Sequence, residues 1–278
     1  MTERLEGKVS IVTGGSLGIG RAVARAFLAE GSRCVLAARG RQRLRATVRE
    51  LSSIGPAVAS FPADVGNEAD VRSLVEYAER ELGPVDALVN CAGVLGPAGA
   101  AAESDAGQWW ETLRTNLLGT FLCTRAVTPG MVRRGRGRIV NSSGGGATSP
   151  LPGFSAYACS KAAVVRLTET VAEELLGTGV SVNAIAPGAV DTRMREALVA
   201  AGGARPGEPA APPERAAELA VYLASEASAG LTGRLISAVW DDWRGLTGRI
   251  PEVMATDLYT LRRVVEDGDA AGPISRFR

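Results

Sequence analysis

Close to its start, the chain runs from an apolar segment through a glycine-rich turn into a helical pattern. Lys8–Thr13 is apolar and β-branched, which is typical of a buried strand. Gly14, Gly18 and Gly20 follow, and Arg21–Glu30 has the Ala-rich amphipathic spacing of a helix. Glycines let a backbone approach a pyrophosphate, and the N–H groups and dipole of a helix start favour its charge. The order of these segments therefore predicts an anion site between the first strand and the first helix.

Strand-like and helix-like segments alternate along the rest of the chain. Apolar runs that predict strands lie at Cys34–Ala38, Ala57–Pro62, Val85–Val89, Arg138–Asn141, Val180–Ile185 and Arg234–Val239. Helical patterns separate them, near residues 41–54, 68–82, 107–134, 155–177 and 214–226. Because strands that alternate with helices of this length form βαβ units, we predict an α/β fold with a doubly wound parallel sheet. The chain has 278 residues, 46% of them apolar, which suits a single domain. We assign residues 1–239 to this domain and residues 240–278 to a C-terminal extension packed on it.

Tyr157 and Lys161 stand four residues apart within one of the helical patterns. Residues at i and i+4 share a helix face, so the phenol and the ammonium project in the same direction. A nearby positive charge lowers a tyrosine pKa toward the working range of a general acid or base. The pair alone leaves a second interpretation open, an exposed tyrosine beside a solvated lysine.

Charge and the absence of histidine exclude several classes of function. Lys and Arg number 31 and Asp and Glu number 30, so a net charge of +1 offers no bulk attraction to nucleic acid or to an anionic membrane. Without histidine, neither a zinc site nor a Ser–His or Cys–His pair is available, and we predict no metal. The four cysteines lack C-x-x-C spacing and are expected to be buried and reduced. The chain shows no signal-peptide pattern and no apolar run of transmembrane length, so we expect a cytoplasmic protein.

The glycine spacing and the Tyr-x-x-x-Lys element together resemble the short-chain dehydrogenase/reductase (SDR) family. Further matches follow over residues 8–192: Asp64-Val65, Asn90-Cys-Ala-Gly93, Asn116 within Thr115-Asn-Leu-Leu-Gly119, and Pro187-Gly-Ala-Val-Asp-Thr192. The resemblance implies a Rossmann-type fold and an NAD(P)-dependent oxidoreductase. Such an enzyme transfers a hydride between its nicotinamide cofactor and a carbonyl or hydroxyl group of a small or medium organic substrate.

The resemblance also implies roles for individual residues. Tyr157 is the general acid or base, Lys161 lowers its pKa and binds the nicotinamide ribose, and Asn116 holds a water that links Lys161 to solvent. Asp64 and Val65 meet the adenine ring. The expected cofactor contacts are Gly14, Ser16, Leu17, Gly18, Ile19, Gly20, Arg39, Asp64, Val65, Asn90, Ala92, Gly93, Tyr157, Lys161, Pro187, Gly188, Val190 and Thr192.

The serine with which the family holds the substrate oxygen is missing from its usual place. Counting back 13 residues from Tyr157 gives Gly144, and the nearest serines are Ser142 and Ser143. We assign the role to Ser143, on the expectation that the following glycines let the turn re-form by one residue. The alternative is that Ser143 points elsewhere, because neighbouring strand residues face opposite ways.

The end of the second strand bears on the choice of cofactor. A carboxylate there would bind the ribose 2′-OH and repel a 2′-phosphate, but this chain has Ala38 followed by Arg39. An arginine without a neighbouring acid suits a 2′-phosphate. Against this, Leu17 stands where many NADP-using relatives carry a second basic residue. We favour NADP(H) over NAD(H).

Two segments near the C-terminus carry further expectations. Residues 200–213 are rich in Gly, Pro and Ala. They either cover the substrate, as the resemblance implies, or form a plain surface connection. Trp240 and Trp243 open the extension, and large apolar groups seldom stay exposed. They could anchor the extension over the substrate pocket or in a subunit interface, but we favour simple packing.

Assembly is also implied by the resemblance. In relatives, the helices matching residues 107–134 and 155–177 pair with their copies across a two-fold axis, which implies a homodimer or homotetramer. The second helix carries an apolar stripe, Val164, Leu167, Val171 and Leu175. Packing within one chain would produce the same stripe.

Two classes of function stay open. We favour an NADP-dependent carbonyl reductase or alcohol dehydrogenase, because Tyr157, Lys161 and Asn116 are all present. The alternative is a dinucleotide-binding protein of the same fold whose catalysis is impaired by the displaced serine. Such a protein would act as a sensor or an assembly partner. The sequence does not identify the substrate.

Overall fold

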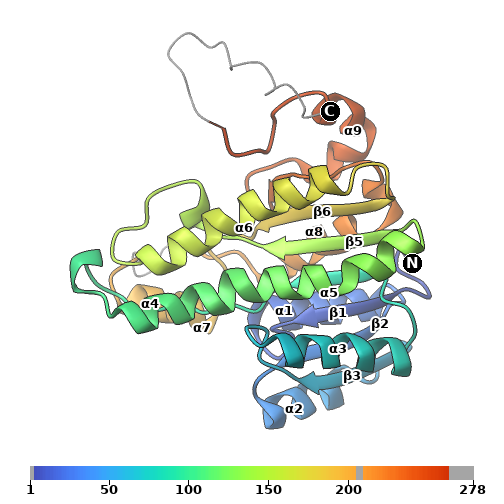
Figure 1. Cartoon of the computed structure of the whole chain (residues 1–278), viewed down its shortest axis with the longest axis horizontal. Coiled ribbons are helices and arrows are strands. Elements are labelled where there is room, and N and C mark those ends of the chain that lie inside the picture. Colours follow the sequence, from blue (N-terminus) through green and yellow to red (C-terminus); the bar gives the residue numbers. More distant parts are fainter. Residues whose placement is uncertain (1–2, 205–208, 263–278) are drawn as a thin grey trace.

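A seven-stranded parallel sheet forms the centre of the molecule in the computed structural model, which describes residues 3–204 and 209–262. The strand order is β3-β2-β1-β4-β5-β6-β7 (Figure 1). The strands are β1 (Val9–Thr13), β2 (Arg33–Ala38), β3 (Ala57–Pro62), β4 (Ala87–Asn90), β5 (Gly137–Ser142), β6 (Val180–Ala186) and β7 (Leu235–Ser237). Every predicted strand is present, and the predicted doubly wound parallel sheet is confirmed.

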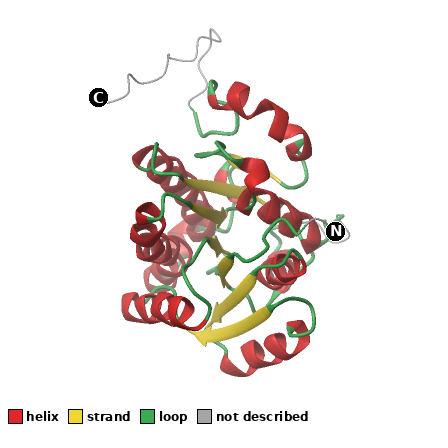
Figure 2. Ribbon diagram, turned by 90° about the vertical axis from the view of Figure 1, so that its right-hand side faces the viewer, coloured by secondary structure: helices red, strands yellow, loops and turns green. Residues whose placement is uncertain are grey.

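Helices cover both faces of this sheet (Figure 2). The helices are α1 (Gly18–Ala29), α2 (Arg41–Leu51), α3 (Glu68–Glu81), α4 (Ala106–Leu113), α5 (Gly119–Arg133), α6 (Ser155–Glu174), α7 (Arg193–Ala200), α8 (Pro213–Ala224) and α9 (Ile250–Met254). Short 3-10 turns lie at Ala101–Glu103, Gly145–Ala147, Glu226–Ser228 and Trp243–Arg249. No helix in the described ranges is both long and apolar enough to cross a membrane.

The alternating strand residues divide the core into two parts. Val12, Val89 and Ile185 point toward α1 and α8, whereas Ile11 and Ile139 point toward α3, α5 and α6. All five side chains are at most 1% exposed. This two-sided burial explains why the strands read as nearly continuous apolar runs in the sequence.

Two helical segments differ from the sequence prediction. The segment predicted as one helix over 107–134 consists of α4 and α5 joined by a π-helical turn, Arg114–Leu118. The segment after β6 contains α7, which the sequence pattern did not predict. Helix α7 buries none of its residues, and it therefore lacks the apolar periodicity that reveals a core helix.

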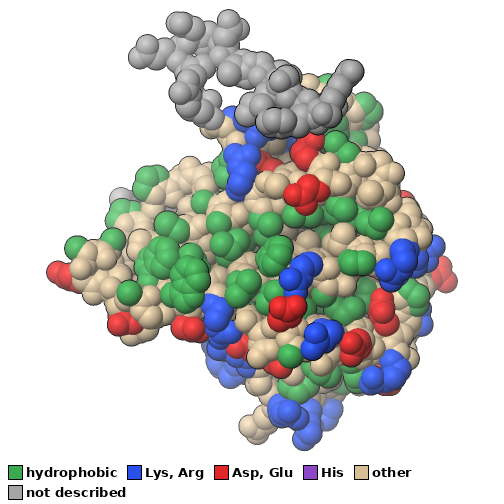
Figure 3. Space-filling model, in the orientation of Figure 1, with side chains coloured by type: hydrophobic (Ala, Val, Ile, Leu, Met, Phe, Trp, Pro, Cys, Tyr) green, Lys and Arg blue, Asp and Glu red, His purple; other side chains and the backbone are tan. Residues whose placement is uncertain are grey.

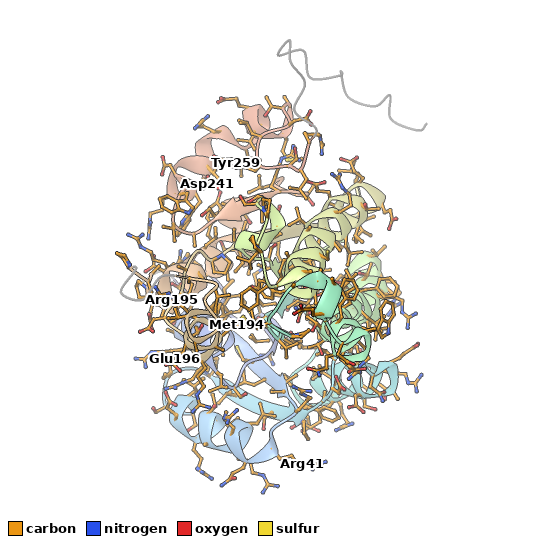
Figure 4. The ribbon with its side chains drawn as sticks, turned by 90° about the vertical axis from the view of Figure 1, so that its left-hand side faces the viewer. Arg41, Met194, Arg195, Glu196, Asp241 and Tyr259 are labelled. Atoms are coloured by element: carbon orange, nitrogen blue, oxygen red, sulfur yellow. The ribbon has the colours of Figure 1, made fainter. Side chains whose placement is uncertain are left out.

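The residues that follow β7 return to the edge of the sheet and to α6. The main-chain N–H of Leu235 donates to the Tyr259 carbonyl at 2.7 Å, and the buried Arg234 guanidinium donates to the Val253 and Thr256 carbonyls. Figure 4 shows Asp241 and Tyr259 close together in this segment. Strand β7 ends at Ser237, shortly before the predicted boundary between residues 239 and 240. Residues 263–278 of the predicted extension lie outside the described residues.

Candidate active site

A deep cleft opens where the chain leaves β1 and β4 for opposite sides of the sheet. Strand β1 lies between β2 and β4, so the connections from β1 and β4 diverge at this point, which is where ligands bind in open α/β sheets. The cleft has a volume of about 1160 Å³. That is large enough for a dinucleotide together with a substrate.

The glycine-rich turn forms the floor of this cleft. Gly14 has a φ of +66°, and a Cβ added to it would lie 2.8 Å from the Ala92 nitrogen. A Cβ on Gly20 would overlap the Gly14 carbonyl oxygen. These two positions therefore require glycine, because the turn packs closely against its own backbone and against the chain after β4. Four of the expected cofactor contacts also line the cleft: Ser16, Leu17, Gly18 and Ile19.

The segment after β6 forms the opposite wall. Thr192 approaches the glycine turn, since a Cβ added at Gly18 would lie 3.2 Å from the Thr192 methyl carbon. The Thr192 hydroxyl also accepts a hydrogen bond from the Arg195 N–H and caps the start of α7. Pro187, Gly188 and Val190 line the cleft on the same side. The structure thus brings these four predicted residues together with the glycine turn.

Basic side chains gather at the end of the cleft next to β2. Arg39, an expected cofactor contact, lines the cleft there, and so does Arg43 on α2. Within the described part of the chain neither arginine forms an ion pair, whereas Arg21 pairs with Glu50. Arg43 was not predicted from the sequence; it stands in the first turn of α2, directly after the bend that carries Arg39.

Asp64 and Val65 lie in the cleft wall beyond β3. One Asp64 carboxylate oxygen accepts from the Arg114 guanidinium at 2.8 Å, and the other accepts from the Gly66 N–H at 3.0 Å. Burial acts to raise the pKa of Asp64, but these hydrogen bonds outweigh it and hold the pKa below its ordinary value. The carboxylate is therefore charged and fixed in place.

The structure does not place Asn90 in the cleft wall, although Ala92 and Gly93 line it. The Asn90 side chain is 4% exposed and donates to the Asn141 side chain of β5 at 2.9 Å. Asn141 in turn donates to the Thr168 hydroxyl on α6 at 2.9 Å. The Asn90 side chain thus ties two strands and α6 together beneath the cleft, and its cofactor contact stays a prediction.

Asn116 lies in the π-helical turn between α4 and α5. Its side-chain oxygen accepts from the Val94 N–H at 2.8 Å, and its amide donates to the Val94 carbonyl and to the Ser160 hydroxyl, each at 2.9 Å. Ser160 also donates to the Tyr157 carbonyl at 2.7 Å. Single π-helical turns occur often at functional sites. Here the turn connects the chain after β4 to the first turns of α6.

Tyr157 and Lys161 both reach the cleft from α6. The Lys161 ammonium lies 5.6 Å from the centre of the Tyr157 ring and donates to the Ser142 carbonyl at 2.8 Å. Burial raises the pKa of Tyr157 to about 12 and lowers the pKa of Lys161 to about 8. The predicted lowering of the tyrosine pKa is therefore wrong for the protein alone, because burial disfavours the charged phenolate.

The Ser143 side chain and a side chain placed at position 144 would face different partners on α6. The buried Ser143 hydroxyl donates to the Lys161 main-chain carbonyl at 3.1 Å, which gives it a different partner from the predicted substrate oxygen. A Cβ added at Gly144 would lie 2.6 Å from the Tyr157 hydroxyl oxygen. Position 144 thus keeps the usual register relative to Tyr157, and the predicted shift of the turn by one residue is not seen.

The two tryptophans of the extension have opposite environments. Trp243 is 5% exposed and packs against Tyr222 of α8, with ring centres 5.8 Å apart. Trp240 lines the cleft and is 83% exposed. The expectation of simple packing holds for Trp243 and is wrong for Trp240.

The cleft fits the nicotinamide dinucleotide that the sequence analysis implies. The glycine-rich turn lines the cleft directly before α1, and the start of that helix supplies N–H groups and a dipole that would favour a pyrophosphate. Arg39, Arg43 and Asp64 would hold the adenosine end, and Tyr157 and Lys161 would adjoin the nicotinamide ribose. The described residues contain no group of three or more His, Cys, Asp and Glu side chains able to hold a metal ion.

Comparisons with known proteins agree with this geometry. The short chain dehydrogenase family model matches residues 8–202. A short chain dehydrogenase of Pseudocercospora fijiensis is 42% identical over 193 residues, which are 69% of this chain and 62% of that relative, so the match spans less than two thirds of its length. The 2-(S)-hydroxypropyl-CoM dehydrogenase 3 of Xanthobacter autotrophicus is 34% identical over 251 residues, 84% of this chain and 95% of the relative. Among solved structures, a variant of actinorhodin polyketide ketoreductase with NADPH superposes with a TM-score of 0.78 and 33% identity, covering 83% of this chain and 95% of that one.

Proposed function

The chain belongs to the short chain dehydrogenase family, and on that basis we propose that it is an NADP-dependent carbonyl reductase or alcohol dehydrogenase of a small or medium organic substrate. Its oxidoreductase class and nicotinamide cofactor follow from the family. The observation that supports carbonyl chemistry here is the Tyr157 hydroxyl, which reaches the cleft opposite a position without a side chain, Gly144. A substrate oxygen has room to meet the phenol at this point.

Tyr157 acts as the proton donor when a carbonyl is reduced and as the acceptor in the reverse direction. Its raised pKa means that the phenol holds its proton at pH 7 but is a weak acid, so donation needs a positive charge nearby to stabilise the phenolate. Lys161 is positively charged below about pH 8 and attracts the charge that develops on the phenol oxygen as the proton leaves. The cofactor, when bound, supplies the hydride chemistry.

Ser143 acts on this site through Lys161. Its hydroxyl holds the Lys161 carbonyl, while the Lys161 ammonium holds the Ser142 carbonyl. These reciprocal bonds join the end of β5 to α6. We propose that Ser143 is a positioning residue and that Tyr157 is the side chain that meets the substrate oxygen. Asn116, through Ser160, fixes the turn of α6 that carries Tyr157.

The preference for NADP rests on Arg39 and Arg43. Both line the cleft beyond β2, and no carboxylate follows Ala38 directly to compete with a 2′-phosphate. Each hydrogen bond from an arginine to a phosphate contributes about 1.5–3 kcal/mol, which corresponds to about 10- to 100-fold in affinity. Arg39→Ala and Arg43→Ala should therefore raise the KM for NADP by about that factor and leave the KM for NAD little changed. Equal losses with both cofactors would contradict the assignment.

Tyr157→Phe tests the proposed chemistry directly. The change removes only the phenol O–H, so NADP affinity should stay the same while kcat for ketone reduction falls by at least about 100-fold. The absorbance of NADPH during turnover gives kcat, and calorimetry gives the affinity for NADPH, so the effects on chemistry and on cofactor binding are measured separately. A variant that keeps a near-normal kcat would remove Tyr157 from the mechanism.

The glycine at position 144 also supports the second candidate, a dinucleotide-binding protein with impaired turnover. No side chain at 144 is available to share the substrate oxygen with Tyr157. The two candidates differ in one result. A protein that binds NADPH tightly but oxidises it with no member of a broad panel of ketones and alcohols is a sensor or an assembly partner.

We also propose that the chain assembles as a homodimer or homotetramer through the face formed by α4, α5 and α6. Figure 3 shows apolar side chains gathered on this face, where Trp110, Leu118 and Phe121 are 63%, 39% and 38% exposed. Exposed apolar clusters of this kind mark interaction surfaces. The predicted stripe on α6 contributes less, because Val164 and Leu175 lie in the chain's own core. The expected cytoplasmic location stays a prediction.

A further inference from the structure

Trp240 is the most exposed large apolar side chain in the described part of the chain. It is 83% exposed and lines the cleft, whereas Trp243, three residues later, is 5% exposed. An exposed indole has no packing role within the chain. A large aromatic group at the wall of a concave site is what a ring-bearing ligand would stack against.

A braced turn fixes the backbone at Trp240. The Ser237 hydroxyl accepts hydrogen bonds from the Val239 and Trp240 N–H groups, at 3.2 and 3.0 Å. The Asp241 carboxylate accepts from the Ser237 N–H at 2.7 Å. On the far side of the turn, Trp243 anchors the chain on α8 through Tyr222. The indole therefore starts from a rigid backbone position, which reduces the entropy lost when a ligand binds against it.

Trp240 shares the cleft with the segment after β6, which supplies several apolar side chains. Its neighbour Val239 packs against Gly188, since a Cβ added at Gly188 would lie 2.7 Å from a Val239 methyl carbon. Met194 and Leu198, one helical turn apart on α7, line the same cleft, and so does Leu151. Figure 4 shows where Met194 lies on α7. Because α7 buries none of its residues, its apolar side chains are available to a ligand.

From this geometry we propose that Trp240 is a specificity-determining residue that selects carbonyl substrates bearing a flat aryl ring. The ring lies against the indole, and Met194, Leu198 and Leu151 contact its apolar surface. This inference rests on the proposed carbonyl chemistry at Tyr157. A saturated ring of the same size presents no flat face and is recognised less well.

The test compares two ketones that share the reacting group, 2-acetylnaphthalene and its fully saturated counterpart 2-acetyldecalin. In Trp240→Ala, kcat/KM should fall about 10-fold more for the naphthyl ketone than for the decalin ketone, whereas Trp240→Phe should keep most of the ratio. Leu258→Ala is the matched control. Leu258 is 46% exposed in the same extension and does not line the cleft, so this variant should leave the ratio unchanged.

A binding measurement separates this inference from the proposed function. Calorimetry with 2-naphthamide, a carboxamide that the enzyme does not reduce, is done on the NADP-loaded protein. Trp240→Ala should weaken its binding about 10-fold. If wild type reduces neither ketone yet shows this loss, the proposed function fails and the aryl subsite stands. Equal losses for both ketones, unchanged naphthamide binding, or a matching effect of Leu258→Ala would each overturn the role of Trp240.

Discussion

Ser143→Ala distinguishes the role that the structure gives this residue from the one expected of a substrate-binding serine. The change removes a buried hydroxyl whose bond to the Lys161 carbonyl is 3.1 Å long. That carbonyl lies inside α6 and keeps its helical N–H partner, so no acceptor is left unsatisfied. The loss is then the net value of one hydrogen bond, about 1 kcal/mol in the free energy of unfolding. Because Lys161 keeps its bond to the Ser142 carbonyl, kcat should fall by less than about 10-fold, against the 100- to 1000-fold typical of a lost oxyanion donor.

Urea unfolding and steady-state reduction of a ketone measure the two quantities on the same preparations. Ser181→Ala is the matched control. Ser181 is 7% exposed on the neighbouring strand β6, and its hydroxyl has no hydrogen-bond partner among the residues that the structure describes. Its removal should cost no stability. A fall of about 100-fold in kcat for Ser143→Ala, with an unchanged free energy of unfolding, would show that Ser143 contacts the substrate oxygen and would refute the positioning role.

Three further outcomes follow from the same geometry. Gly144→Ser should lower kcat by about 10-fold or more, because the new Cβ would lie 2.6 Å from the Tyr157 hydroxyl and must displace it; a rise in kcat would contradict this. The pKa of Lys161, about 8 when folded and 10.5 when unfolded, means that the unfolded chain binds more protons between these values. The free energy of unfolding of the wild type, measured relative to that of Lys161→Met, should therefore rise by about 3 kcal/mol between pH 8 and pH 10.5. The control variant Lys8→Met keeps Lys161 and should show the same rise. Phe121→Arg should yield a monomer by light scattering, and an unchanged mass would exclude this face as the interface.

The strands, the glycine turn and the fold class could be predicted from the sequence because each has a local cause. The strands at Val9–Thr13 and Val180–Ala186 are buried on both sides, and that leaves a continuous apolar run in the sequence. The glycine spacing reflects close backbone contacts of the turn with itself and with the chain after β4. Spacing on one helix likewise placed Tyr157 and Lys161 on the same side of α6.

What the sequence could not supply depends on contacts between distant segments. The direction of the Tyr157 pKa shift depends on how deeply the phenol is buried, and i, i+4 spacing does not report burial. The partner of Ser143 is a carbonyl on another element, so counting residues could not find it. Trp240 and Trp243 are the same residue type in one short segment, and only the packing of Trp243 on α8 separates their environments.

The segment after β7 has a consequence for the behaviour of the chain in solution. Two N–H groups of this outermost strand, those of Leu235 and Ser237, donate to the Tyr259 carbonyl and the Asp241 carboxylate. Without them, a short apolar strand would offer free donors at the rim of the sheet, a template on which other chains could add strands and aggregate. Residues 241–259 therefore shield the molecule from edge-to-edge association, at the same place where they hold the turn beside the cleft.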